Sequence, residues 1–312
     1  MERIEKSRFE WVGPNANESE VISRPVTSYW KDAMHRLSRN KTAMVCFCII
    51  AIIGILALLV PAFSPYSISE QHYAHVNAPM FFTDPTDGHM HLFGTDTLGR
   101  DIFTRVWYGA RISLFISFTA VFVNFLIGIV YGGIAGYMGG AIDTIMMRFI
   151  EIINGIPYLI VVILLMMIIP KGIWTMVIAY AAVGWTNMAR LVRGQVMSLK
   201  QQDYVVAARV MGARPSRIIS KHLLPNTLSV VIIAITLEIP SAIFTEAFLS
   251  YIGLGVQIPL ASWGTLANEG SRVFQMYPSQ LAIPAICISL TMLSFNLLGD
   301  GLRDAFDPRL RR

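Results

Sequence analysis

Four polar side chains interrupt long apolar stretches of the sequence, where their chemistry would be unusual. Glu151 and Asn154 precede Pro157 in one such stretch, and Glu238 and Glu246 lie in another. Ionisable groups inside a membrane are costly and usually face protein or water. Glu151, Asn154 and Glu238 are therefore candidates for lining a polar pathway through a bilayer.

The same carboxylates could serve in structural pairing or in proton transfer. Glu151 could pair with the nearby Arg148, and Glu246 could bind backbone groups at a helix end. Glu151 or Glu238 could instead carry protons in a transporter driven by an ion gradient. The residue types alone do not choose between a lined pathway and these two roles.

Catalytic and nucleotide-binding motifs are absent from the sequence. It has no Gly-x-Ser-x-Gly, no His-Glu-x-x-His and no Gly-Lys pair, so it lacks a phosphate loop. Cys46, Cys48 and Cys287 lie in apolar runs and are expected to be small buried hydrophobes. We expect no enzyme, no cofactor and no metal site in this chain.

The composition is that of a membrane protein. Of 312 residues, 54% are hydrophobic and 14% charged, against about 25% charged in soluble domains. The net charge of +5 is not gathered into Lys/Arg blocks, so nothing indicates nucleic acid. The expected surroundings are a lipid bilayer.

Six stretches have the length and hydropathy of membrane-spanning helices. At a rise of 1.5 Å per residue, about 20 residues cross a hydrocarbon core of about 30 Å. No internal repeat is visible. We expect an all-α, polytopic membrane protein with spans at residues 42–63, 112–135, 149–169, 172–189, 227–249 and 280–299.

Positive charges predict the orientation. With the N-terminus inside, 20 of the 25 Lys and Arg residues fall in inside segments. Both termini are then cytoplasmic, in a multi-pass protein of the plasma membrane. The expected parts are a tail with an interfacial helix (1–41), a first span (42–63), an extracytoplasmic loop (64–111), a helical core (112–299) and a tail (300–312).

Residues 202–226, QDYVVAARVMGARPSRIISKHLLPN, are too polar to span a membrane and too patterned for a linker. Asp203 can cap a short helix that Gly212 ends, because glycine readily takes a positive φ. Pro215 suits the first turn of a second helix, which Pro225 would end. Ile218, Ile219 and Leu223 would give this second helix an apolar side.

Two interpretations of the 202–226 segment follow from physics alone. Its apolar side could insert into a groove on a soluble partner and carry the partner's motion to the adjoining spans. It could equally rest on anionic lipid headgroups as an interfacial amphipathic helix. Both remain open at this level.

Motifs in the sequence resemble those of a known family. The pattern A-A-x3-G-x11-L-P, formed by Ala207, Ala208, Gly212, Leu224 and Pro225, resembles the EAA loop of ABC-importer permeases. The oligopeptide/dipeptide permease family, and most of all its C-type subunits, is similar in HLFGTDTLGRDIFTRVWYGARISL (91–114), TEAFLSYIGLG (245–255) and NLLGDGLRDAFDP (296–308). The similarity runs from about residue 30 to the C-terminus. One departure is Val206, which stands at the family's Glu position.

This resemblance implies a type I ABC-importer permease fold that translocates oligopeptides or dipeptides. The alternative within the family is nickel or another small solute. Implied partners are a second homologous permease in a heterodimer, an extracytoplasmic peptide-binding protein and two ABC ATPase subunits that bind MgATP. The residues implied to dock on the ATPases are Ala207, Ala208, Arg209, Gly212, Ala213, Arg217, His222, Leu224 and Pro225.

Glycines recur every fourth residue at the end of the second predicted span, at Gly128, Gly132, Gly136 and Gly140. Small residues at this spacing let another helix approach closely. The contact could slide as the pathway opens, or it could be static packing within the subunit.

Two further features lie between the first and second spans. The turn GTDTLGRD (94–101) could form an internal salt-bridged turn or contact a binding protein. His72, His75, His89 and His91 raise the question of a metal site, but their spacing is loose, and structural roles are expected.

Overall fold

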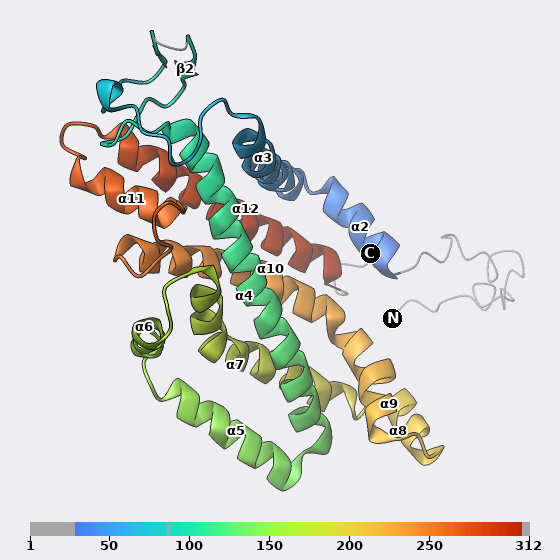
Figure 1. The fold of residues 1–312 in the computed structure, drawn as a ribbon. Coiled ribbons are helices and arrows are strands. Elements are labelled where there is room, and N and C mark those ends of the chain that lie inside the picture. Colours follow the sequence, from blue (N-terminus) through green and yellow to red (C-terminus); the bar gives the residue numbers. More distant parts are fainter. Residues whose placement is uncertain (1–28, 86–87, 308–312) are drawn as a thin grey trace, which may run out of the picture.

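The computed structural model describes residues 29–85 and 88–307, and these fold almost entirely into helices (Figure 1). The polar segment at residues 1–25, expected to be a cytoplasmic tail, lies outside the described residues.

Two helices open the described chain, α2 (Tyr29–Arg39) and α3 (Lys41–Phe63). Asn40 separates them and caps α3, since its Oδ1 accepts the Ala43 N–H at 3.1 Å. Along α3 many large apolar side chains are exposed, Phe47 and Leu58 among them. The first predicted span is confirmed as a helix long and apolar enough to cross a membrane.

A compact loop structure follows, here called the hairpin region (residues 64–101 together with α11, Trp263–Arg272). It contains the short helix η2 (Tyr73–His75) and strands β1 (Phe82–Thr83) and β2 (Met90–His91), which pair antiparallel. The next helix begins at Ile102 rather than at residue 112, because Asp101 caps it by accepting the Thr104 N–H at 2.7 Å.

Helices α4 (Ile102–Met138) and α7 (Ile173–Leu199) form the centre of the molecule. In Figure 1, α4 runs from the hairpin region toward the opposite end, where α8 (Asp203–Val210) and α9 (Pro215–Ile218) lie. α4 therefore joins the two ends of the protein directly.

The predicted span at residues 149–169 is not one straight helix. It is divided between α5 (Gly140–Asn154) and α6 (Tyr158–Ile168), which are bent by 76°. Pro157 has no N–H to donate and disfavours helical geometry at Ile156, so the helix breaks there. α5 is tied to α7 by an ion pair between Asp143 and Arg193.

The last third of the chain contains η3 (Ile219–Leu223), α10 (Leu224–Tyr251), α11 and α12 (Ser279–Phe306). α12 packs against α3 and α10 and continues to Phe306. The segment from residue 300, predicted as a tail, is therefore helical over most of its described length.

In the described residues, four helices are long and apolar enough to cross a membrane, or five if α5 and α6 form one bent span. The prediction of six spans is not confirmed. α7 contains the predicted fourth span, yet it does not join this group, because Asn187, Arg190 and Arg193 make its second half polar.

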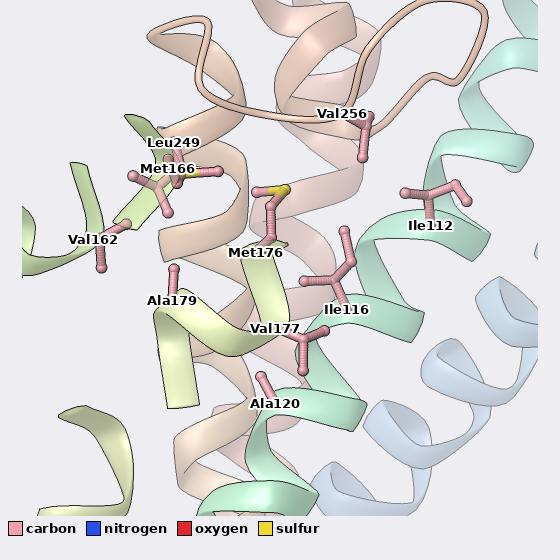
Figure 2. Close-up of a cluster of buried hydrophobic side chains, with 10 residues drawn as sticks. All are labelled: Ile112, Ile116, Ala120, Val162, Met166, Met176, Val177, Ala179, Leu249 and Val256. Atoms are coloured by element: carbon pink, nitrogen blue, oxygen red, sulfur yellow. The ribbon is translucent and has the colours of Figure 1, made fainter. Parts of the chain in front are cut away.

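The core between these helices consists of several apolar clusters. Figure 2 shows one, in which side chains of α4, α6, α7 and α10 meet; Ile116, Val162 and Met176 are among its buried members. A second cluster joins α4 and α7 to α8, α9 and η3 through Val205, Ile218 and Leu223. The 202–226 segment is thus part of the packed molecule.

Candidate functional site

The 202–226 segment folds as two short helices joined by a turn at Gly212. Gly212 has φ +78°, a conformation that glycine adopts without steric cost, and it follows α8 directly. Pro215 occupies the first turn of α9. Both features agree with the sequence-based expectation.

Two details differ from that expectation. Gln202, not Asp203, stands at the N-cap of α8, and Asp203 is the first residue of the helix. Pro225 does not end the second helix. The chain passes from α9 through η3, a π-helical turn in which the Leu224 N–H bonds to the Ile219 carbonyl, directly into α10. Pro225 then falls in the first turn of α10, where no donor is needed.

The apolar side of the second helix also differs from the expectation, because it faces the core of the chain and not a partner. Ile218 and Leu223 are fully buried against the chain's own core, and Ile219 packs beside them. They are therefore not available to a partner, contrary to the expectation. What they do is fix η3 and the start of α10 to the cluster around Val192 and Val196.

A different set of apolar side chains is exposed. Val210 and Met211 are 82% and 81% exposed, and Tyr204 and Val206 on α8 are exposed as well. We call these four residues the α8 face. Arg209, Arg214 and Arg217 are exposed around it. Exposed apolar side chains on a short segment that also exposes basic ones are suited to a partner.

The remaining residues implied by the resemblance differ in their exposure. Ala207 and Pro225 are exposed, Ala208 is buried, and Ala213 and Leu224 are half-buried. Arg209 lies over the ring of Tyr137 on α4, 5.8 Å from its centroid, and His222 is near the ring of Tyr204. The 202–226 segment is consequently in contact with α4 at the end of that helix.

The glycine series packs against α7 for three of its four members. A Cβ on Gly128 would stand 2.6 Å from the Cβ of Met188, and one on Gly136 would stand 2.8 Å from the Arg193 oxygen. A Cβ on Gly132 would overlap the Ala189 oxygen. Gly140 does not share the contact, because α4 ends at Met138 and nothing lies within 4 Å of its added Cβ.

Two of the pathway candidates are held by polar partners. Glu151 pairs with Arg148 at 2.7 Å, and both side chains are exposed, as one sequence interpretation proposed. Asn154, at the end of α5, accepts a hydrogen bond from the Thr186 hydroxyl of α7 at 3.1 Å. Neither of them lines the groove that contains Glu238.

Glu238 lines a groove of about 300 Å³ between α7 and α10. Its Oε1 accepts a hydrogen bond from Asn124 Nδ2 of α4 at 2.7 Å. Sequence reasoning missed Asn124, whose signal was a single amide within an apolar stretch. Glu246 is buried away from this groove and accepts the Ser250 hydroxyl at 2.7 Å, which indicates a structural role.

The turn at residues 94–101 is an internal salt-bridged turn. Asp96 accepts from Arg100 Nε at 2.7 Å and is also bonded to Arg105. Both arginines reach Glu269 on α11, at 3.0 and 2.7 Å. These ion pairs hold α4, the turn and α11 together.

The loop histidines are engaged with carboxylates and rings. His91 Nδ1 lies 2.8 Å from Asp101 Oδ1, and the ring of His91 stacks on Tyr66 at 4.2 Å. His75 Nδ1 lies 3.1 Å from Asp84. In the part of the chain that the structure describes, His, Cys, Asp and Glu side chains do not form a group of three or more able to hold a metal ion.

Two family models match the chain. Residues 128–312 match binding-protein-dependent transport system inner membrane components, and residues 28–79 match the N-terminal TM domain of oligopeptide transport permease C. The first match covers more than half of the chain and includes both the 202–226 segment and Glu238.

Curated relatives are similar over nearly their whole length. The oligopeptide transport system permease protein OppC of Bacillus subtilis is 49% identical over 312 residues, 100% of both chains. The dipeptide transport system permease protein DppC of the same organism is 50% identical over 95% of this chain and 90% of its own. OppC of Escherichia coli is 39% identical over 95% of this chain and 96% of its own.

Proposed function

The chain belongs to the family of binding-protein-dependent transport system inner membrane components, and we propose that it is the permease subunit of a peptide importer. Its relatives at 49% and 50% identity are named oligopeptide and dipeptide transport permeases. Peptide is therefore the proposed solute, in preference to nickel.

The observation that carries this proposal is the two-sided 202–226 segment. One side, with Ile218 and Leu223, is fixed in the core, while the α8 face is exposed. A partner that binds the α8 face would move a segment continuous with α10 and packed on α4 and α7. The motion of a partner would thus reach the spans through Val205, Ile218 and Leu223, which are packed in the core.

The proposed partners follow from this arrangement. Two ATPase subunits on the cytoplasmic side would hydrolyse ATP, and one would contact the α8 face. A second permease subunit would complete the pathway, and an extracytoplasmic binding protein would deliver peptide to the hairpin region. Both termini would be cytoplasmic, since the basic residues around α8 are then inside.

Two glycine substitutions test the proposal in cells that express the complete importer. Gly212 (φ +78°) and Gly253 (φ +86°) have equally open surroundings, so leucine strains both turns alike. We expect Gly212→Leu to abolish uptake of trialanine while the subunits still co-purify, because it reorients the α8 face. Gly253→Leu, at the other end of α10, is the control and should retain most uptake.

Three results would contradict the proposal. The first is normal uptake by Gly212→Leu. The second is uptake of nickel without uptake of trialanine by the unmodified importer. The third is uptake that survives ATP depletion and collapses with the proton gradient, which would indicate an ion-driven transporter.

A further inference from the structure

The groove between α7 and α10 has one carboxylate among its lining residues. Glu238 is half-buried there, beside Tyr180, Leu191, Ala234 and Leu237. Asn124 occupies only one of its two oxygens, and no hydrogen bond to the second oxygen is found among the described residues. A carboxylate between apolar walls is stabilised by a cation that can also donate hydrogen bonds.

The position of Glu238 depends on the absence of a side chain at Gly184 of α7. Asn124 is fully buried on α4 and reaches Glu238 on α10 by passing Gly184 of α7. A Cβ on Gly184 would overlap the Asn124 amide nitrogen, so no larger residue leaves room for this contact. Three helices therefore combine to hold one carboxylate at the groove.

A positive charge is bonded to another residue that lines the same groove. Asn187, another lining residue, follows Gly184 by three positions, which is about 4.5 Å along a helix axis. Its Oδ1 accepts a hydrogen bond from Arg190 Nη2 at 2.9 Å. The groove thus has an acid at Glu238, and the guanidinium of Arg190 is bonded to its lining residue Asn187.

We propose that Glu238 binds the ammonium group of a peptide's free amino terminus in this groove, and that Asn124 is the residue that positions it. The inference rests on the proposed function, and it names the chemical group of the substrate that the permease itself recognises. An ammonium donates to the free carboxylate oxygen, while the peptide's carboxylate would follow toward Asn187 and the Arg190 bonded to it. The ring of Tyr180 on the groove wall suits the same cation.

The test compares trialanine with N-acetyltrialanine, which lacks the ammonium group, in cells that express the complete importer. Glu238→Gln keeps an oxygen that accepts from Asn124 but loses the charge. Because the binding protein is the same in every strain, a change in the preference between the two peptides arises in this chain. We expect Glu238→Gln to lower trialanine uptake by about tenfold or more and to leave N-acetyltrialanine uptake within about twofold.

Two further variants separate a positioning role from a structural one. Asn124→Ala should lower trialanine uptake by less than Glu238→Gln does, again without affecting N-acetyltrialanine. Glu238→Asp keeps the charge and should restore trialanine uptake in part, a readout that does not depend on the acetylated peptide. Asp304→Asn makes the same acid-to-amide change on the exposed side of α12 and should alter neither uptake.

Several outcomes would overturn the inference. Equal losses for both peptides in Glu238→Gln would show a structural role, and so would a failure of Glu238→Asp to restore uptake. Unchanged uptake in Glu238→Gln would show that the carboxylate is not used. If the unmodified importer took up neither peptide, the proposed function itself would fail. This result can be told apart from a failure of the inference about Glu238, because it is seen without any variant.

Discussion

Where α4 meets the hairpin region, Arg105, Arg100 and Asp96 are only 1%, 3% and 4% exposed, whereas at the other end of α4 the apolar side chains of the α8 face are open to the surroundings. The two regions thus reverse the usual distribution of charged and apolar residues. Buried ion pairs fix α11 to α4. An open apolar face, in contrast, is incomplete without something to cover it.

Whether a side chain is buried or exposed therefore distinguishes a structural role from a partner-binding role better than its residue type does. In the hairpin region, charges that could have met a binding protein are used to hold elements together. At the α8 end, the apolar side chains of the α8 face are exposed, and nearby residues such as Val205 and Ile218 are buried in the core instead. Substitutions can therefore break the two regions in opposite ways.

The largest effect is expected from Arg105→Met, at the start of α4 beside the hairpin region. This change leaves Asp96 and Glu269 short of a buried partner, which costs about 3–5 kcal/mol in other proteins. The measurement is the thermal unfolding of the purified complex. Arg148→Met is the control, since the Arg148–Glu151 pair is exposed and worth about 0–1 kcal/mol. Equal losses in the two variants would contradict the structural role of the buried pairs.

The buried side of the 202–226 segment should respond next. Ile218→Ala removes a fully buried side chain and should destabilise the protein by about 2–5 kcal/mol. Val210→Ala, on the α8 face, should leave stability within about 0.5 kcal/mol and lower peptide uptake instead. Unfolding and uptake measured on the same two variants check this contrast, and it fails if the two show the same pattern.

The contact of α4 with α7, which connects the two regions, should show an intermediate effect. Gly132→Ala places a Cβ against the Ala189 backbone and should cost about 1–3 kcal/mol by overpacking. Gly194→Ala, on the exposed side of α7 with nothing within 4 Å, should instead stabilise the protein by about 0.5–1 kcal/mol. Unfolding midpoints with the same sign would contradict the close helix contact.

The smallest effect is expected from Val206→Glu, which introduces the residue type that the resemblance to the EAA loop implies at this position. Val206 is exposed, so the change should alter stability by no more than about 0.5 kcal/mol. Peptide uptake should stay within about threefold of the unmodified importer. A loss of tenfold or more would show that the partner of this chain is adapted to an apolar residue there.

The sequence predicted the helices and the turn of α8 with α9 because hydropathy, Gly212 and Pro215 act locally. It did not predict that the helix continues past Pro225, because the π-helical turn depends on how Ile218 and Leu223 pack in the core. The same packing decides which apolar side of the segment is exposed.

Contacts between distant residues explain the rest. The ion pair of Arg105 with Glu269 joins residues 164 positions apart, and the bond of Asn124 to Glu238 joins residues 114 apart. Neither partner carries a local signal that identifies the other. The count of six spans is not confirmed for a related reason, since α7 packs against α4, α6 and α10 and carries polar residues that lower its hydropathy.

The central claim is that the α8 face meets an ATPase subunit and not lipid, and crosslinking in intact membranes tests it most directly. A photoreactive amino acid would replace Met211 and, as a control, Met276 near the hairpin region, which are 81% and 80% exposed. We expect an adduct between position 211 and a nucleotide-hydrolysing subunit, and none with that subunit from position 276. Lipid adducts alone at position 211 would contradict the claim and favour an interfacial helix at this site.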